Sequence, residues 1–310
     1  MKIFSGSSNK PLAKKIAKLL KIGLSPLDIH IFPDQEKRVR VVDKVVGEDC
    51  VVVQSTSPNA DKNYMELFFI IDALKRSGAK SVTAVIPYVG YERQDHVFRD
   101  GEAVSLEVII KILESLGVGK VIAIDLHSVK IPELFNVPVV HLSMLPIFAR
   151  TIKEKGWDDN NTVLVSPDMG GIRRIKMLSE MLGDLHYLTI EKDRDLRTGE
   201  ISMEKMRGEV KKRAIIVDDM ISTGGTIIGA ASLLCKKGAR EVFVFATHPV
   251  FSGEASKVLE DSVAKKIFVT DTIDIPAAKK FPKLEVLSAA GIIAKNLKSQ
   301  ISNRKTTTQI

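Results

Sequence analysis

The sequence is poor in cysteine and in aromatic residues. Only two cysteines occur among 310 residues, and Phe, Trp and Tyr together make up 5% of the chain. Two cysteines, each inside an apolar stretch, supply neither a disulfide framework nor a thiolate metal site, so we interpret Cys50 and Cys235 as core residues. Aromatic side chains do not interleave with the basic runs, and a single-strand binder needs such a stacking platform. We therefore expect no nucleic-acid partner.

Long apolar runs are also missing. No stretch approaches the roughly 20 apolar residues that span a bilayer, and MKIFSGSSNK lacks the segments and cleavage site of a secretion signal. These absences predict a soluble, cytoplasmic protein with no membrane partner. The 46 Lys and Arg residues exceed the 38 Asp and Glu residues, which gives a formal net charge of +8. With nucleic acid set aside, this excess suits small phosphorylated substrates.

Short β-branched runs alternate with helical patterns along most of the chain. The runs are almost continuously apolar, as expected of strands buried on both faces of a parallel sheet. Helical patterns at 65–78 and 226–238 lie between them, and each ends in a glycine. The sequence therefore predicts an α/β fold with doubly wound, mainly parallel sheets. The predicted strands cover residues 50–55, 81–88, 120–127, 162–168, 186–192, 214–219, 241–248 and 266–271.

The two halves of the chain resemble each other. The segment LKRSGAKSV at 74–82 returns as LCKKGAREV at 234–242, and a strand, a loop and a helix precede each copy in the same order. We therefore expect two tandem copies of one α/β unit, with a boundary near 142–160. The expected divisions are an N-terminal domain at 1–145, a C-terminal domain at 146–298, and a polar tail at 299–310 that we expect to be disordered.

The stretch IIVDDMISTGGT at 215–226 concentrates the chemistry. In open parallel sheets, ligands bind beyond the carboxyl ends of the strands, where Asp218 and Asp219 would point. Glycines let a ligand approach the backbone, and the start of the next helix aims N–H groups at a phosphate. A ribose reconciles the acids with a phosphate, because its hydroxyls can bond to the carboxylates while its 5-phosphate enters the loop. The loop residues are Ser222, Thr223, Gly224, Gly225 and Thr226.

The common nucleotide loops are absent. GxxxxGK[ST] does not occur, and GVGKVI at 117–122 lacks the third glycine of GxGxxG. The alternative to a ligand site is an ordinary strand, turn and helix with acidic turn residues. The corresponding place in the first half, QSTSPNAD at 54–61, has neither the adjacent pair of acids nor the paired glycines, so we expect that half to have lost its phosphate loop.

VDDMISTGGT resembles the phosphoribosyl-diphosphate-binding motif of the type I phosphoribosyltransferase fold. Four further stretches, FPDQE, PYVGYERQD, DLHS and VSPDMGGIRR, occur in this order and resemble the ribose-phosphate pyrophosphokinase family. The likeness runs from KIFSGSSN to about residue 298. It implies two phosphoribosyltransferase-like domains that transfer the β,γ-diphosphoryl group of ATP to ribose 5-phosphate, with Mg²⁺ as cofactor.

The resemblance also implies a role for each matching residue. It makes Lys192 and Arg194 the catalytic cations, and the turn at 34–36 a contact for adenine that relatives supply from a neighbouring subunit. A homo-oligomer built from dimers follows. The ATP residues are Asp34, Gln35, Glu36, Arg93 and Gln94; those around Mg²⁺ are His127 and Asp168; those at ribose 5-phosphate are Arg194, Asp218, Asp219 and Ser222 to Thr226.

Three departures from the family pattern stand out. Many relatives have aspartate where this chain has Ser222, and DLHSVKIPELF and RQDHVFRDGEAVS differ from the usual bacterial and animal versions. They suggest a variant closer to archaeal enzymes and leave open whether phosphate activates it and ADP inhibits it. Two other functions also stay open: a salvage phosphoribosyltransferase, and a regulatory homologue without catalysis.

Overall fold

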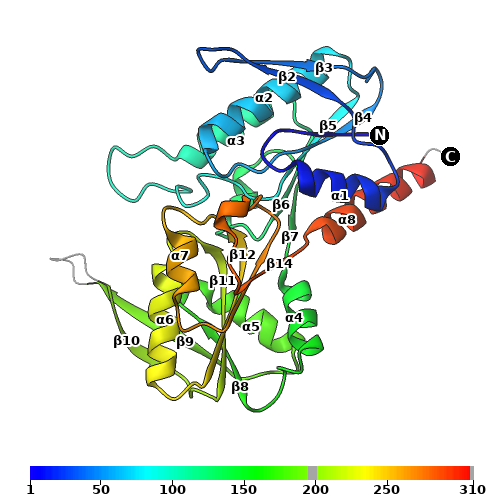
Figure 1. Cartoon of the computed structure of the whole chain (residues 1–310). Coiled ribbons are helices and arrows are strands. Elements are labelled where there is room, and N and C mark those ends of the chain that lie inside the picture. The colour runs from blue at the N-terminus through cyan, green and yellow to red at the C-terminus, as the bar shows by residue number, and fades with distance from the viewer. Residues whose placement is uncertain (195–200, 308–310) are drawn as a thin grey trace. The chain divides into compact units, whose positions relative to one another are not determined.

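The computed structural model describes the backbone of residues 1–194 and 201–307, and the side chains of residues 1–191 and 206–299. The chain divides into two compact units, which Figure 1 draws as one ribbon. Unit 1 holds Met1–Leu142, Thr272–Asp274 and the chain from Ser288 onward, and unit 2 holds Ser143–Asp271 and Ile275–Leu287. Within the described residues, no helix combines the length and apolarity that crossing a bilayer requires.

Unit 1 is built on a five-stranded parallel sheet. Its strands follow the order β1 (Lys2–Ser5), β4 (Asp49–Val53), β5 (Ser81–Ile86), β6 (Lys120–Ile124) and β7 (Val139–Leu142). One face packs against α2 (Ala60–Arg76) and α3 (Ser105–Ser115) in a continuous apolar core. Helices α1 (Lys10–Leu20) and α8 (Ala290–Thr307) lie side by side (Figure 1). A 3-10 turn, η1 (Ile131–Leu134), precedes β7.

A two-stranded hairpin, β2 (Leu27–Ile31) and β3 (Lys37–Val41), lies outside this sheet. Its antiparallel register pairs Leu27 with Val41 and Ile31 with Lys37. An isolated hairpin has little stability in water, so it depends on packing against α2 and on Leu27, Val39 and Val41, which lie against the core of unit 1.

Unit 2 is built on a seven-stranded sheet in which only β10 is antiparallel, paired with β9. The order is β10 (Ile201–Arg207), β9 (Tyr187–Arg194), β8 (Thr162–Ser166), β11 (Arg213–Ile221), β12 (Glu241–Pro249), β13 (Lys266–Thr270) and β14 (Leu284–Leu287). The other elements are α4 (Leu145–Glu154), η2 (Met169–Gly171), α5 (Ile172–Met181), α6 (Gly225–Lys236), α7 (Ala255–Glu260) and η3 (Ala277–Lys279).

The path through the unit 2 sheet reverses between β8 and β11. From β8 the chain passes through α5 to β9 on one side, and from β11 it passes through α6 to β12 on the other. Because such crossovers are right-handed, α5 and α6 cover opposite faces of the sheet (Figure 1). Neighbouring strands whose connections diverge leave a crevice at their carboxyl ends, and ligands bind there in open α/β sheets.

The predicted doubly wound α/β fold is confirmed, and each of the eight predicted strands is present within a few residues of its expected bounds. Strands β1, β2, β3, β7, β10 and β14 were not predicted. The end of the chain also differs from expectation. Residues 288–298 belong to unit 1, because α8 buries Ile293 and Leu297. The tail expected to be disordered continues this helix to Thr307, since extending a helix is easier than starting one; residues 308–310 lie outside the described residues.

Both cysteines are free thiols in the interior or near it. Cys50 is buried on β4 and Cys235 is half-buried on α6. Burial raises the pKa of the Cys50 thiol to about 11, so the thiol is uncharged at neutral pH. Their interpretation as core residues is confirmed.

Truncation of the aromatic core should destabilise unit 2. Phe245 is fully buried, with ring centroids 4.4 Å from Phe268 and 5.3 Å from Phe148. Phe245→Ala should lower the free energy of unfolding by about 3–5 kcal/mol, because it loses apolar burial and leaves a cavity. The single tryptophan, Trp157, stacks on Phe243 in the same unit, so its fluorescence during urea unfolding measures the change.

The matched control is Val263→Ala in the same unit. Val263 is 51% exposed, so its truncation should change the free energy of unfolding by less than about 0.5 kcal/mol. Equal losses for the two variants would contradict the placement of Phe245 in the core.

Candidate active site

Three carboxylates gather at the strand ends where the unit 2 chain reverses. β8 and β11 are parallel neighbours, with Val165 paired to Ile216. Asp218 and Asp219 follow in β11, and Asp168 comes just beyond the end of β8. Asp168 lies close enough to Asp218 to repel it electrostatically. The structure thus brings these three predicted site residues together in the crevice where a ligand is expected.

Arg174, near the start of α5, bridges the paired acids. Its Nη1 lies 3.3 Å from Oδ1 of Asp218, and its Nη2 lies 3.5 Å from Oδ2 of Asp219. Little of these three side chains is exposed: 17% for Arg174, 13% for Asp218 and 7% for Asp219. Backbone N–H groups also hold the acids, since Asp219 donates to Oδ1 of Asp218 and Met220 donates to Oδ1 of Asp219, both at 2.9 Å. The carboxylates are therefore fixed before any ligand arrives.

The crowding of these carboxylates changes the pKa of Asp218. Burial raises its pKa, and the adjacent negative charge of Asp219 raises it further. Arg174 opposes the shift, and Asp168 adds to it. The pKa of Asp218 therefore lies well above its ordinary value of 3.8, which means that one guanidinium does not fully compensate the crowded carboxylates.

The loop after β11 leads directly into α6. Gly224 has φ +86°, a left-handed conformation that favours glycine, and a Cβ there would meet Leu259 Cγ at 3.3 Å. Gly224 is the N-cap residue of α6 and has no side chain to cap the helix start, where the first N–H groups lack intrahelical partners. The Ser222 hydroxyl lies 3.2 Å from that of Ser252. Thr223 and Gly225 are exposed. This geometry suits an anion at the helix start.

The loop after β8, within the VSPDMGGIRR stretch, is tightly built by contacts that its sequence did not predict. Asp168 caps η2, where its Oδ1 accepts a hydrogen bond from the Gly171 N–H at 3.2 Å. The Ser166 hydroxyl donates to the carbonyl of Asp168 at 2.8 Å. A Cβ on Gly171 would lie 2.3 Å from Ser166 Oγ, so a larger residue would displace this loop. The loop fixes Asp168 next to the acids of β11.

Lys192 and Arg194 lie on β9, beside β8. The backbone register pairs them with Met203 and Ile201 of β10. Their side chains lie outside the described residues, so their predicted catalytic role stays a prediction.

In unit 1, a buried glutamate links two of the predicted ATP and metal segments. Arg93 and Gln94 are exposed and follow Glu92, which is 1% exposed. Oε2 of Glu92 accepts a hydrogen bond from the backbone N–H of His127 at 3.1 Å. His127 is itself exposed just beyond β6. Glu92 and His127 are 35 residues apart in the sequence. Their bond brings the PYVGYERQD and DLHS stretches together at one edge of the unit 1 sheet.

The predicted adenine contacts, Asp34, Gln35 and Glu36, form the exposed turn between β2 and β3. The Phe32 N–H donates to the Glu36 carbonyl, and the Gln35 N–H donates to the Phe32 carbonyl, both at 2.9 Å. Gln35 has φ +73°. The turn has a defined shape, and the side chains of residues 34–36 are exposed.

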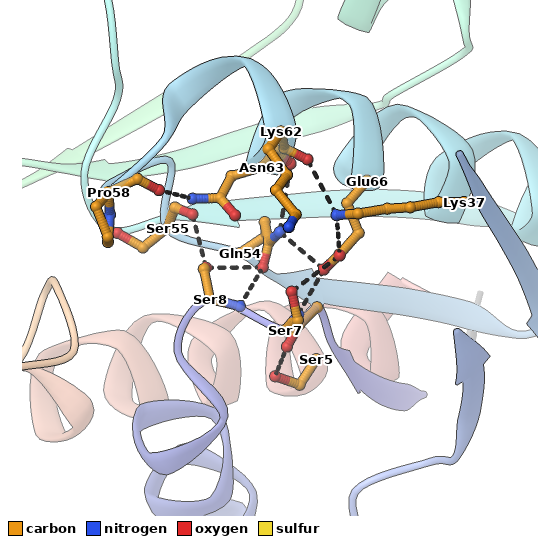
Figure 2. Close-up of polar contacts among 11 residues, drawn as sticks. Ser5, Ser7, Ser8, Lys37, Gln54, Ser55, Pro58, Lys62, Asn63 and Glu66 are labelled. Carbon is orange, nitrogen blue, oxygen red and sulfur yellow. Dashed lines mark hydrogen bonds and ion pairs between the residues drawn. The ribbon is translucent and has the colours of Figure 1, made fainter. Parts of the chain in front are cut away.

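A buried polar network fills the strand ends of unit 1, and sequence reasoning missed it (Figure 2). Gln54 follows β4, and its Oε1 accepts hydrogen bonds from the N–H and hydroxyl of Ser8 at 3.2 and 2.8 Å. Its Nε2 donates to Oε1 of Glu66 on α2 at 3.1 Å. Gly6 leaves room for this, because a Cβ there would lie 2.2 Å from Gln54 Oε1. The polar runs FSGSSN and QSTSPN after apolar strands were the available signal.

A divalent metal fits the donor chemistry of unit 2 better than that of His127. Magnesium prefers oxygen ligands and keeps several waters. Asp168, Asp218 and Asp219 offer carboxylate oxygens at one strand edge, whereas His127 offers a ring nitrogen in unit 1. Over the described part of the chain, no group of three or more His, Cys, Asp or Glu side chains is placed so that it could hold a metal ion. The expected Mg²⁺ contacts stay predictions.

Removal of one charge should stabilise the site. Because the folded-state pKa of Asp218 is raised, its ionisation costs stability once the pH exceeds the unfolded value of 3.8. Asp218→Asn keeps the shape and the acceptor for the Asp219 N–H. Its urea midpoint, measured by Trp157 fluorescence with EDTA present, should exceed that of the wild type at pH 7, and the gap should close as the pH falls toward 3.8.

Asp159→Asn is the control with the opposite sign. Burial alone would raise the pKa of Asp159, but hydrogen bonds from Thr162 and Asn161 outweigh burial and lower this pKa. Its charge therefore contributes stability above the unfolded pKa, and the variant should unfold at slightly less urea than the wild type at pH 7. A midpoint for Asp218→Asn at or below that of the wild type would show that Arg174 fully compensates the acids.

Comparisons with known proteins agree with this architecture. Family models match residues 1–117, as the N-terminal domain of ribose phosphate pyrophosphokinase, and residues 202–309, as a phosphoribosyl synthetase-associated domain. The chain is 40% identical to the ribose-phosphate pyrophosphokinase of Fusobacterium nucleatum, covering 100% of this chain and 98% of that one. It is 38% identical to the enzyme of the same name from Bacillus subtilis, covering 95% and 92%.

A solved structure is similar along nearly the whole chain. The phosphoribosylpyrophosphate synthetase of Mycobacterium smegmatis matches with a TM-score of 0.91 and 34% identity, covering 97% of this chain and 99% of that one. The two expected phosphoribosyltransferase-like domains are thereby confirmed. These three relatives are bacterial, and the predicted kinship with archaeal enzymes stays a prediction. The full-length similarity leads to one conclusion: the chain belongs to the ribose-phosphate pyrophosphokinase family.

Proposed function

We propose that this chain is an ATP-dependent ribose-phosphate pyrophosphokinase, which makes phosphoribosyl diphosphate and AMP from ribose 5-phosphate and ATP. The observation that carries the proposal is the pair Asp218 and Asp219, held by Arg174 next to the uncapped start of α6. Adjacent acids and an anion-binding helix start are the two features that a phosphorylated ribose needs. The full-length similarity to relatives of that name supports the same reaction.

Ribose 5-phosphate would bind across the two features. Asp218 and Asp219 accept hydrogen bonds from sugar hydroxyls. The 5-phosphate accepts hydrogen bonds from the N–H groups and hydroxyls of the loop from Ser222 to Thr226. Charge repulsion decides the orientation of ribose 5-phosphate, because a phosphate placed at the acids would be repelled by two carboxylates. Ser222 can donate to the phosphate, although it cannot act as the carboxylate that many relatives have there.

The reaction forms one bond and breaks another at phosphorus. The 1-hydroxyl oxygen of the ribose attacks the β-phosphorus of ATP, the bond from that phosphorus to the oxygen bridging to the α-phosphorus breaks, and AMP leaves. The hydroxyl proton is released. Negative charge builds up on phosphoryl oxygens during transfer, so fixed cations should contribute most. We assign this role to Lys192 and Arg194 because they match the family pattern on β9.

ATP would be held by segments of unit 1. Arg93 and Gln94 are exposed, and an arginine can grip phosphate oxygens with two donors. Asp34, Gln35 and Glu36 point outward from their turn, which suits contact with the adenine of a neighbouring subunit. Mg²⁺ bound with ATP would neutralise phosphoryl charge, with Asp168 and His127 as its expected contacts. A cytoplasmic, dimer-based homo-oligomer is part of the proposal, as the family resemblance implies.

A product assay tests the proposal. Purified protein with ribose 5-phosphate, Mg²⁺ and ATP should yield AMP and phosphoribosyl diphosphate in equal amounts, measured by anion-exchange chromatography. A salvage phosphoribosyltransferase would instead consume phosphoribosyl diphosphate when given a base. A regulatory homologue would bind ATP and form neither product, and that result would remove the proposed activity.

Removal of the expected catalytic cation should affect turnover more than binding. Lys192→Ala should lower kcat by roughly 10²–10³-fold while KM for each substrate changes little, because the cation acts mainly on charge that develops in the transition state. Steady-state kinetics of AMP formation measure both constants. The control is Lys176→Ala on α5, which removes an exposed lysine of the same unit and should keep wild-type kcat. Full turnover by Lys192→Ala would exclude Lys192 from catalysis.

A further inference from the structure

Lys37 is a lysine with almost no exposed side chain. It is the first residue of β3, directly after Glu36, and its side chain is 5% exposed. Its Nζ lies 2.5 Å from Oε2 of Glu66 and donates to the backbone carbonyl of Lys62 at 3.2 Å. Lysine is rarely buried unless its charge is paired. Both partners lie on α2, so one side chain fixes the base of the hairpin turn to that helix (Figure 2).

Glu66 is suited to hold this charge because it is anchored on its other side. Its side chain is 1% exposed. Besides Lys37, it accepts hydrogen bonds from the N–H and hydroxyl of Ser7 at 2.5 and 2.8 Å and from Nε2 of Gln54 at 3.1 Å. Burial alone would raise the pKa of Glu66, but the bonds from Lys37 and Ser7 outweigh burial and lower it. The acceptor therefore stays charged and immobile.

The same contact joins the two walls of a groove. Gln35, Glu36 and Lys37 line one side, and residues of α2 line the other, in a groove of about 750 Å³. Met65 and Phe69 contribute its apolar surface and are 47% and 37% exposed. The bonds from Lys37 to Glu66 and to Lys62 cross from the turn to the helix, so they set the distance between these walls.

The turn has little other support. Ile31 and Lys37 form the last pair of the hairpin ladder, and the residues between them are exposed. Packing of the hairpin against the core comes from Leu27, Val39 and Val41, at or toward its far end. A hairpin held only at that end would let its turn move, since two strands alone have little stability. Lys37 is the residue that ties the turn end down.

We propose that Lys37, held by Glu66, is a positioning residue for ATP binding: it fixes the turn at residues 32–36 against α2 so that its outward side chains meet the nucleotide. The proposal rests on the proposed function, in which Asp34, Gln35 and Glu36 contact adenine. Lys37 itself touches no substrate. Its loss should therefore weaken ATP binding and leave the chemical step and ribose 5-phosphate binding unchanged.

The test compares Lys37→Met with the wild type. Lys37→Met should raise KM for ATP about tenfold, with kcat and KM for ribose 5-phosphate within about twofold of wild type, because only uniform binding of one substrate is lost. Calorimetric titration with ATP alone should show the same loss without turnover. Lys37→Arg restores the charge and should recover most of the affinity. The control is Arg38→Met, which breaks an exposed ion pair with Asp28 on the same hairpin and should leave KM for ATP unchanged.

The outcomes separate the two proposals. If the wild type forms no AMP and phosphoribosyl diphosphate, the proposed function fails. If the wild type is active and Lys37→Met has an unchanged KM for ATP, Lys37 is merely structural. The same holds if the variant shows only a smaller fraction of active protein and a lower thermal stability. If Lys37→Met does not fold, Lys37→Met/Glu66→Gln takes its place, because it leaves no charge buried without a partner. An unchanged KM for ATP in that double variant would equally overturn the positioning role.

Discussion

The repulsion among carboxylates at the ends of β8 and β11 is the constraint on which the site depends. Asp168, Asp218 and Asp219 share one strand edge, and Arg174 bridges the last two at 3.3 and 3.5 Å. A protein optimised for stability alone would not bury this excess of negative charge. Hydrogen-bond donors would relieve this repulsion, and under the proposed function the hydroxyls of a ribose supply them. Under the proposed function, the unfavourable charge at these strand ends is thus a source of affinity for the sugar.

The strand ends differ between the two units. In unit 2 the ends of β8 and β11 present acids and an uncapped helix start. At the ends of β1 and β4 in unit 1, Ser8, Gln54 and Glu66 bond to one another and leave those groups occupied. The polar atoms that a ligand would meet there bond to one another, which is a physical reason to expect that the first half lacks a phosphate loop. The same network gained another use, because Lys37 connects it to the turn of the hairpin.

The sequence predicted those elements and site residues that a local pattern of residues determines. Continuous apolar strands, and the acids of β11 with the glycines that follow it, were visible because each lies within about ten consecutive residues. Arg174 and Asp218 are 44 residues apart, and Lys37 and Glu66 are 29 apart, so no local pattern could pair them. The hairpin escaped notice because its strands are short and half-exposed. Helix α8 was assigned to the wrong unit because its burial against unit 1 depends on tertiary packing.

Net charge and local charge act at different distances on the same substrates. A formal charge of +8 attracts phosphorylated molecules from solution, without regard to their orientation. Within the site the sign changes, since Asp218 and Asp219 repel any phosphate that approaches them. In the proposed site, a ribose 5-phosphate drawn in by the whole chain would therefore lie with its phosphate at the start of α6 and its hydroxyls at the acids. Under this proposal, electrostatics favours the orientation before any contact specific to the sugar is made, and the 1-hydroxyl would lie away from the phosphate loop.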